Sequence, residues 1–252
     1  TGVPEEELIS CAVQSLGLSE LSPFKPAEKI VEYTVQTPGK HLRDLSLTNF
    51  VHELASESPA PGGGSVAALC GCLSASLSSM VANLTFEKKG MEPLRPDMEK
   101  WAREAQAMKR KLLYLVDEDM QAFNGILEAR RLPKNSQEER HKRDNSILAA
   151  NCRATIVPLS MLKMVPELLT TALEMVEKGN PSSLSDAGVA ALTALACGEG
   201  AYFNVLINLS GLGTSEEEVT FNHNCRVEAD QLIKAVRAEY EKIRALVLSR
   251  IS

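Results

Sequence analysis

The most informative candidate for chemistry in the sequence is a single carboxylate, Asp119. An apolar stripe with alternating three- and four-residue spacing runs from Met98 to Ile126, and Asp119 occupies a stripe position that would normally hold Leu or Ala. Its neighbours Asp117 and Glu118 point elsewhere on the predicted helix, Asp117 to nearly the opposite side. Burial raises the pKa of a carboxyl group toward the range of a general acid or base. Taken alone, the residues allow either a functional site or a structural role, in which Asp119 forms an internal salt bridge or caps a helix.

Other polar residues stand in apolar surroundings and are further candidates for binding. Asn204 and Asn208 lie one turn apart in an apolar helix, where they can hydrogen-bond a planar heterocycle or simply join helices. Asp186 stands at a predicted helix start and is either a site residue or a partner of the helix dipole. Lys88 and Lys89 close another apolar helix, where they suit an anionic ligand tail or a solvated helix end.

A triple glycine precedes the least charged segment of the chain. Gly62, Gly63 and Gly64 follow two prolines, and Gly64 or Ser65 is expected to cap the helix that begins there. Residues 58–86 contain no Asp, Glu, Lys or Arg, and small residues repeat along them with alternating four- and three-residue steps: Gly64, Ala68, Gly71, Ala75, Ser78 and Ala82. A second stripe holds larger residues: Leu69, Leu73, Leu77, Met80 and Leu84. We therefore expect this helix to be buried on two adjacent faces.

Composition excludes several classes of function. With 27 Lys and Arg against 33 Asp and Glu, the net charge of −6 disfavours non-specific nucleic-acid binding. The cysteines and histidines lack metal-ligand spacing, so we expect no metal site and reduced, buried, cytosolic thiols. The uncharged run could span a bilayer by length, but its serines and glycines favour a buried soluble helix and no membrane partner. The sequence has no signal peptide, and its start at Thr1 suggests a fragment or a processed product.

The periodicity predicts an all-α fold, a multihelical up-and-down bundle with long helices, preceded by a short αβ remnant. Helices are expected over residues 4–16, 47–54, 64–88, 98–126, 136–178, 186–209 and 215–250, with capping boxes at Ser136-x-x-Glu139 and Ser215-x-x-Glu218. The run Ile30–Val35 is a candidate strand. Prolines cluster in the first 96 residues, which places a domain boundary near residue 40.

Four motifs in this order resemble the cyclodeaminase/cyclohydrolase family of folate enzymes. They are the runs 58–68 (SPAPGGGSVAA), 115–119 (LVDED), 131–135 (RLPKN) and 201–209 (AYFNVLINL). The resemblance covers about residues 44 to 250, while residues 1–35 look like the end of a glutamate formiminotransferase domain. We therefore expect residues 1–43 to be a remnant of that domain with its linker, and residues 44–252 to be a cyclodeaminase domain.

The resemblance implies a cytoplasmic enzyme of one-carbon metabolism and histidine degradation. Such an enzyme is an ammonia-lyase type cyclodeaminase that closes 5-formiminotetrahydrofolate to 5,10-methenyltetrahydrofolate and releases ammonia. The family's catalytic aspartate falls on Asp119, and the resemblance places Gly62–Ser65, Asp186, Asn204 and Asn208 in the site lining. It further implies a polyglutamylated tetrahydrofolate substrate whose tail meets Lys88–Lys89, no metal, and a homodimer or higher oligomer joined to a formiminotransferase domain in the intact chain.

Two alternatives stay open at this point. The same family contains methenyltetrahydrofolate cyclohydrolases, although the formiminotransferase-like N-terminal segment argues against that activity. The uncharged helices with small-residue seams would also suit a catalytically idle dimerisation module.

Overall fold

The computed structural model describes residues 2–3, 5–20, 22–30, 41–58 and 60–251, and every regular element within these ranges is helical. The elements are α1 (Glu5–Ser15), α2 (Pro26–Lys29), η1 (Leu42–Asp44), α4 (Leu47–Leu54), α5 (Gly63–Glu87), η2 (Glu92–Leu94), α6 (Arg95–Arg131), α7 (Gln137–Lys178), η3 (Pro181–Ser183), α8 (Leu184–Leu209) and α9 (Glu216–Ile251). The all-α prediction is confirmed. The candidate strand at Ile30–Val35 lies outside the described residues except for Ile30, which ends α2 in an extended conformation.

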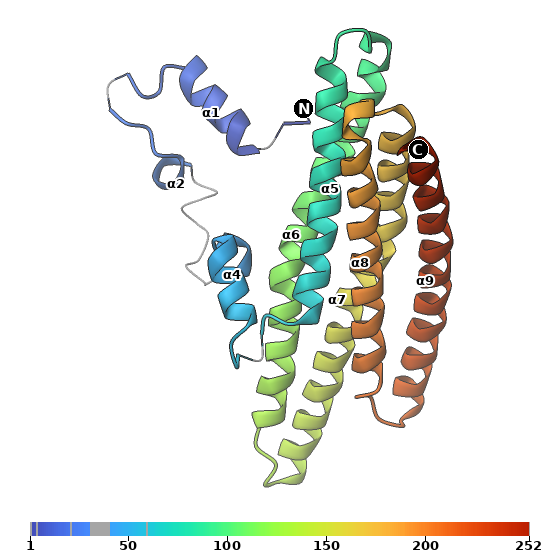
Figure 1. Ribbon diagram of the computed structural model, residues 1–252. Helices are drawn as coiled ribbons and strands as arrows, with labels where there is room; N and C mark the ends of the chain where they lie inside the picture. The colour runs from blue at the N-terminus through green and yellow to red at the C-terminus, as the bar shows by residue number, and fades with distance from the viewer. Residues whose placement is uncertain (1, 4, 21, 31–40, 59, 252) are drawn as a thin grey trace.

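The long helices α5 to α9 form an up-and-down bundle, with α1, α2 and α4 lying to one side of it (Figure 1). Within the bundle, α5 packs against α6 and α8, and α7 packs against α6, α8 and α9. The core is a single cluster of mainly aliphatic side chains contributed by all the long helices, because each has one apolar stripe to bury. Short turns join antiparallel neighbours, so the start of α5 and the end of α8 lie at the same end of the bundle (Figure 1).

Side-chain caps fix several helix starts, two of them at the predicted capping boxes. Ser46 accepts a hydrogen bond from the backbone N–H of Asn49 at 3.2 Å, which starts α4. Ser136 and Glu139 form a complete capping box at the start of α7. Ser215 and Glu218 exchange the same pair of bonds before α9. Such helix starts can be predicted from the sequence because a cap needs only residues three positions apart.

The expected cap of α5 is wrong. Its N-cap is Gly62, which has no side chain to accept a hydrogen bond. Ser65 instead directs its hydroxyl to α6, where the carbonyl oxygen of Val116 lies 3.0 Å away. The start of α5 is therefore held by a neighbouring helix and not by its own first residues.

Only one of the two expected faces of α5 is buried. The stripe of small residues from Gly64 to Ala82 is buried throughout, as predicted. The prediction that the stripe of larger residues is also buried is wrong, since Leu73, Met80 and Leu84 are 48%, 39% and 48% exposed. Small residues let α6 and α8 approach α5 closely. Among the larger residues, Leu69 and Leu77 pack partly against the core, whereas the other three are exposed in the single chain.

Glycine is required where α8 crosses α5. A Cβ on Gly200 would lie 2.9 Å from the Cβ of Ala67, so neither side chain can be larger without separating the two helices. Gly198 contacts Val165 and Val236 from the other side of α8. The two glycines therefore let α8 pack closely against its neighbours on both sides.

The cysteines are free, but their predicted burial is only partly correct. Cys72, Cys197 and Cys225 are buried, Cys70 and Cys152 are half-buried, and Cys11 is exposed. Within the described residues, three helical segments are long and apolar enough to cross a membrane by length and composition: Gly63–Glu87, Gln137–Lys178 and Pro181–Leu209.

Candidate functional site

The carboxyl group of Asp119 lies directly over the first turn of α5. A Cβ on Gly64 would overlap all three atoms of that carboxyl group, so only glycine allows the approach. The Ser65 hydroxyl lies 3.3 Å from Asp119 Oδ2 and 3.0 Å from the carbonyl oxygen of Val116. The glycine run and the carboxylate, 54 residues apart in sequence, thus form one site.

Burial raises the pKa of Asp119, and hydrogen bonds from the Ser65 hydroxyl and backbone N–H oppose that rise. The Ser65 hydroxyl has one proton and can serve either charge state of the carboxyl group. It can donate to an ionised Asp119, or it can donate to Val116 and accept from a protonated Asp119. This arrangement lets Asp119 gain and lose a proton without a large rearrangement, which general acid–base catalysis requires.

Asn204 reaches the same helix start from α8. Its amide nitrogen is 3.5 Å from the position that a Cβ on Gly63 would take, and it donates to the Gly200 carbonyl oxygen at 2.8 Å. Asp119 on α6 and Asn204 on α8 therefore flank the first turn of α5. Backbone N–H groups in such a turn have no partner within the helix and are available to a polar or anionic ligand.

Asn208 lies one turn further along α8, and its side chain joins two helices. Its amide nitrogen donates to the Ala154 carbonyl oxygen at 2.6 Å, which joins α8 to α7. Both readings of the Asn pair therefore find support: Asn204 adjoins the candidate site, and Asn208 joins two helices.

Three predicted site residues lie at the other end of the bundle. Lys88 is 24 residues from Gly64 along α5, about 36 Å at the helical rise of 1.5 Å per residue. Its ammonium group donates to the side-chain oxygen of Asn180, just before η3. Lys89 is exposed beside it, and Asp186 is in the first turn of α8, at this same end. Within one chain, the structure does not bring these residues to Asp119.

Sequence reasoning missed the role of Asp117. This carboxylate is 1% exposed and accepts the backbone N–H of Leu42 at 2.6 Å. His41 Nδ1 and Arg43 Nε lie 3.6 and 3.4 Å from its other oxygen. Asp117 therefore fastens η1 to α6, two residues from Asp119. No local pattern could reveal this, because the donor is 75 residues away.

A metal centre finds no support among the residues that the structure describes. There, no group of three or more His, Cys, Asp or Glu side chains is placed to hold a metal ion.

Two family models match consecutive parts of the chain. The formiminotransferase-cyclodeaminase model matches residues 46–229, and the formiminotransferase domain model matches residues 1–36. The longer match includes all of α5 to α8 and most of the candidate site's surroundings.

Curated relatives and a solved structure agree with the longer match. A formimidoyltransferase-cyclodeaminase from Mus musculus is 43% identical over 82% of this chain and 39% of that protein, and one from Sus scrofa is 38% identical over 98% and 44%. A methenyltetrahydrofolate cyclohydrolase from Methylorubrum extorquens is 35% identical over 82% of this chain and 98% of that protein.

The crystal structure of a formiminotetrahydrofolate cyclodeaminase from Thermotoga maritima has a TM-score of 0.72 and 29% identity, covering 84% of this chain and all of that one. The present chain spans less than half the length of the two-activity relatives named above. On the match of residues 46–229 and on these identities, the chain belongs to the formiminotransferase-cyclodeaminase family.

Proposed function

We propose that this chain is a formimidoyltetrahydrofolate cyclodeaminase, in which Asp119 is the acid–base group. The observation that carries the proposal is the half-buried carboxyl of Asp119, with a raised pKa, lying on the glycine-rich first turn of α5. The names of the relatives and of the Thermotoga maritima protein support the substrate class.

The proposed reaction needs one proton to move between two nitrogens. Folate nitrogen N10 attacks the carbon of the protonated formimino group, N5–CH=NH2⁺, which forms a C–N bond and a tetrahedral intermediate that carries an NH2 group. Asp119 accepts the proton from N10 and returns it to the former imino nitrogen, which departs as ammonia. The C–N bond to ammonia breaks, and the 5,10-methenyl bridge remains. A single carboxyl with a raised pKa can serve both steps.

The remaining site residues have supporting roles in this proposal. The N–H groups of Gly63 and Gly64 bind polar atoms of the pterin or of the intermediate, and Asn204 hydrogen-bonds the heterocycle. Asn208 fixes α8 so that Asn204 stays in place. The role of Lys88 and Lys89 toward a polyglutamate tail and the place of Asp186 in the site lining stay predictions.

The direct test measures ammonia release and methenyl absorbance with 5-formiminotetrahydrofolate. We expect kcat to fall by about 10² to 10⁴ in Asp119→Asn, the contribution of a positioned acid–base group. Glu118→Gln is the matched control, because Glu118 neighbours Asp119 but forms a peripheral salt bridge with Arg153 at 3.0 Å. Equal turnover by Asp119→Asn and the wild type would remove Asp119 from the mechanism.

A methenyltetrahydrofolate cyclohydrolase is the second candidate. The Methylorubrum extorquens relative favours it, since the match covers nearly all of that protein. Rapid hydrolysis of the methenyl compound without ammonia release from the formimino substrate would establish this activity. If no reduced folate bound at all, the chain would be an idle dimerisation module.

We further propose a homodimer that covers the outer face of α5 and α8. The exposed large apolar side chains of these two helices include Leu73, Met80, Leu84, Val189, Leu192, Phe203 and Ile207. Exposed apolar side chains concentrated on neighbouring helices are typical of a protein interface.

We also propose the division into residues 1–43 and 44–252, a formiminotransferase domain upstream in the intact protein, and a cytoplasmic location.

A further inference from the structure

The groove between α5 and α6 is occupied by the beginning of the described chain. It has a volume of about 690 Å³, and residues Gly2, Val3 and Glu7 line it together with side chains of the two helices. Gly2 is buried there, although α1, which follows it, lies beside the bundle (Figure 1). The first residues therefore contact the bundle more closely than the helix after them.

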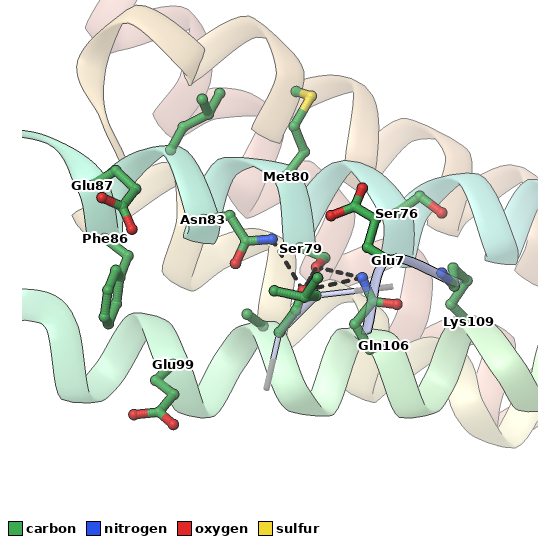
Figure 2. A pocket seen from close by; sticks show the side chains of 14 residues that line it. Glu7, Ser76, Ser79, Met80, Asn83, Phe86, Glu87, Glu99, Gln106 and Lys109 are labelled. Atoms are coloured by element: carbon green, nitrogen blue, oxygen red, sulfur yellow. Dashed lines mark hydrogen bonds between the residues drawn. The ribbon is translucent and has the colours of Figure 1, made fainter. Parts of the chain in front are cut away.

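Three side-chain donors converge on one backbone oxygen in this groove. The amide groups of Asn83 and Gln106 donate to the Gly2 carbonyl oxygen at 3.1 and 3.2 Å, and the Ser79 hydroxyl lies 3.4 Å from it. Gln106 also donates to the Ser79 oxygen at 3.0 Å, so the donors support one another. Figure 2 shows Ser79, Asn83 and Gln106 pointing together across the groove.

Two of the three donor side chains are buried in the bundle. Ser79 and Gln106 are 2% and 5% exposed. Leaving a buried polar group without a hydrogen-bond partner lowers the free energy of unfolding. If the Gly2 carbonyl left, the Gln106 amide would keep only its bond to Ser79. The groove thus has a specific requirement for a backbone acceptor.

The occupant must also be glycine. A Cβ on Gly2 would overlap the Cβ of Ala102, which is fixed to the α6 backbone and cannot turn away. The niche therefore recognises both a carbonyl oxygen and the absence of a side chain. Two independent features select the same residue.

We propose that this groove is the docking site for the end of the formiminotransferase domain on the bundle, with the Gly2 carbonyl as its anchor. The inference rests on the proposed domain division, supported by the match of residues 1–36 to the formiminotransferase domain model. The anchor holds the end of the formiminotransferase domain against α5 and α6, and thereby sets the position of that domain relative to the bundle. It is 14 residues along α5 from Ser65, about 21 Å from the acid–base site.

The test is limited proteolysis of the full chain with a glutamate-specific protease. Cleavage after Glu7, which lines the groove, is compared in the same digestion with cleavage after the exposed Glu57. When opening is fast, proteolysis reports the population of the undocked segment. Losing one or two hydrogen bonds changes such a population about five- to thirtyfold.

Two variants disrupt the contact, one in the bound segment and one in the groove. Gly2→Ala introduces the overlapping Cβ, and Gln106→Leu removes the central donor at similar volume. Each should raise the ratio of the two cleavage rates about five- to thirtyfold, and the double variant should raise it no further than the stronger single change. Gly125→Ala and Gln121→Leu are the matched controls, since a Cβ on Gly125 meets no atom within 4 Å and Gln121 is exposed on α6.

Ratios within twofold of the wild type in both Gly2→Ala and Gln106→Leu would overturn the docking proposal. So would equal increases in the two controls. Ammonia release is measured in parallel and should stay within twofold in all four single variants. Because the proteolysis ratio does not depend on turnover, failure of the docking proposal is distinguishable from failure of the proposed activity.

Discussion

Replacing Gly64 with alanine perturbs the candidate site without removing any functional group. The new Cβ would lie 2.6 Å from Asp119 Oδ2 and nearer still to the other two carboxyl atoms, whereas ordinary contact begins at 3.4 Å. The carboxyl group must therefore retreat by about 0.8 Å or more from the α5 backbone. A misplacement of about 1 Å can cost about 10²-fold in rate. We expect kcat for ammonia release to fall about a hundredfold.

Stability should change much less than activity. Alanine in a helix gains about 0.5–1 kcal/mol over glycine, and the displaced side chain can rotate toward solvent. We therefore expect the free energy of unfolding of Gly64→Ala to fall by about 1 kcal/mol at most, near the low end of overpacking costs. Gly125→Ala is the control on the helix that carries Asp119, because its added Cβ meets nothing within 4 Å.

The assay is steady-state ammonia release with chemical denaturation of the same preparations. A kcat within twofold of the wild type in a folded Gly64→Ala variant would refute the reasoning, since Asp119 could then work from a different position. An equal loss in Gly125→Ala would likewise show that the effect is not specific to the carboxylate.

Three further predictions concern charge and assembly. Because burial raises the pKa of Asp119, the folded state holds its proton to higher pH than the unfolded state, and the charged form costs stability above that pKa. Asp119→Asn should therefore raise Tm at pH of about 8, with a smaller gain at pH of about 4, as checked by calorimetry. Asp117→Ala leaves the buried Leu42 N–H without its acceptor and should cost about 2–3 kcal/mol in urea unfolding, while Asp44→Ala, exposed beside it, should cost less than about 0.5. Leu73→Glu should convert a dimer to a monomer in light scattering, and an unchanged mass would exclude this face as the interface.

The fold class and the residue at the centre of the candidate site can be predicted from the sequence alone. Helical periodicity, the capping boxes before α7 and α9, and the glycine and proline stops act over a few residues, so they can be read without tertiary contacts. Asp119 stood out for the same reason, because a carboxylate on an apolar stripe is visible within one helix. Its pairing with the glycine run was inferred from a family resemblance and not from either segment.

Which other residues lie near Asp119 depends on long-range contacts between helices. Asp117 looked like a residue facing away, but its partner is a backbone N–H 75 residues upstream that no helical pattern reveals. Lys88 and Asp186 lie at the far end of the bundle from Asp119, since antiparallel packing groups helix ends by topology and not by composition. The outer stripe of α5 is as apolar as a core face in sequence, yet a single chain has no helix to cover Leu73. Long-range packing alone determines which apolar faces find a partner and which carboxylates meet a donor.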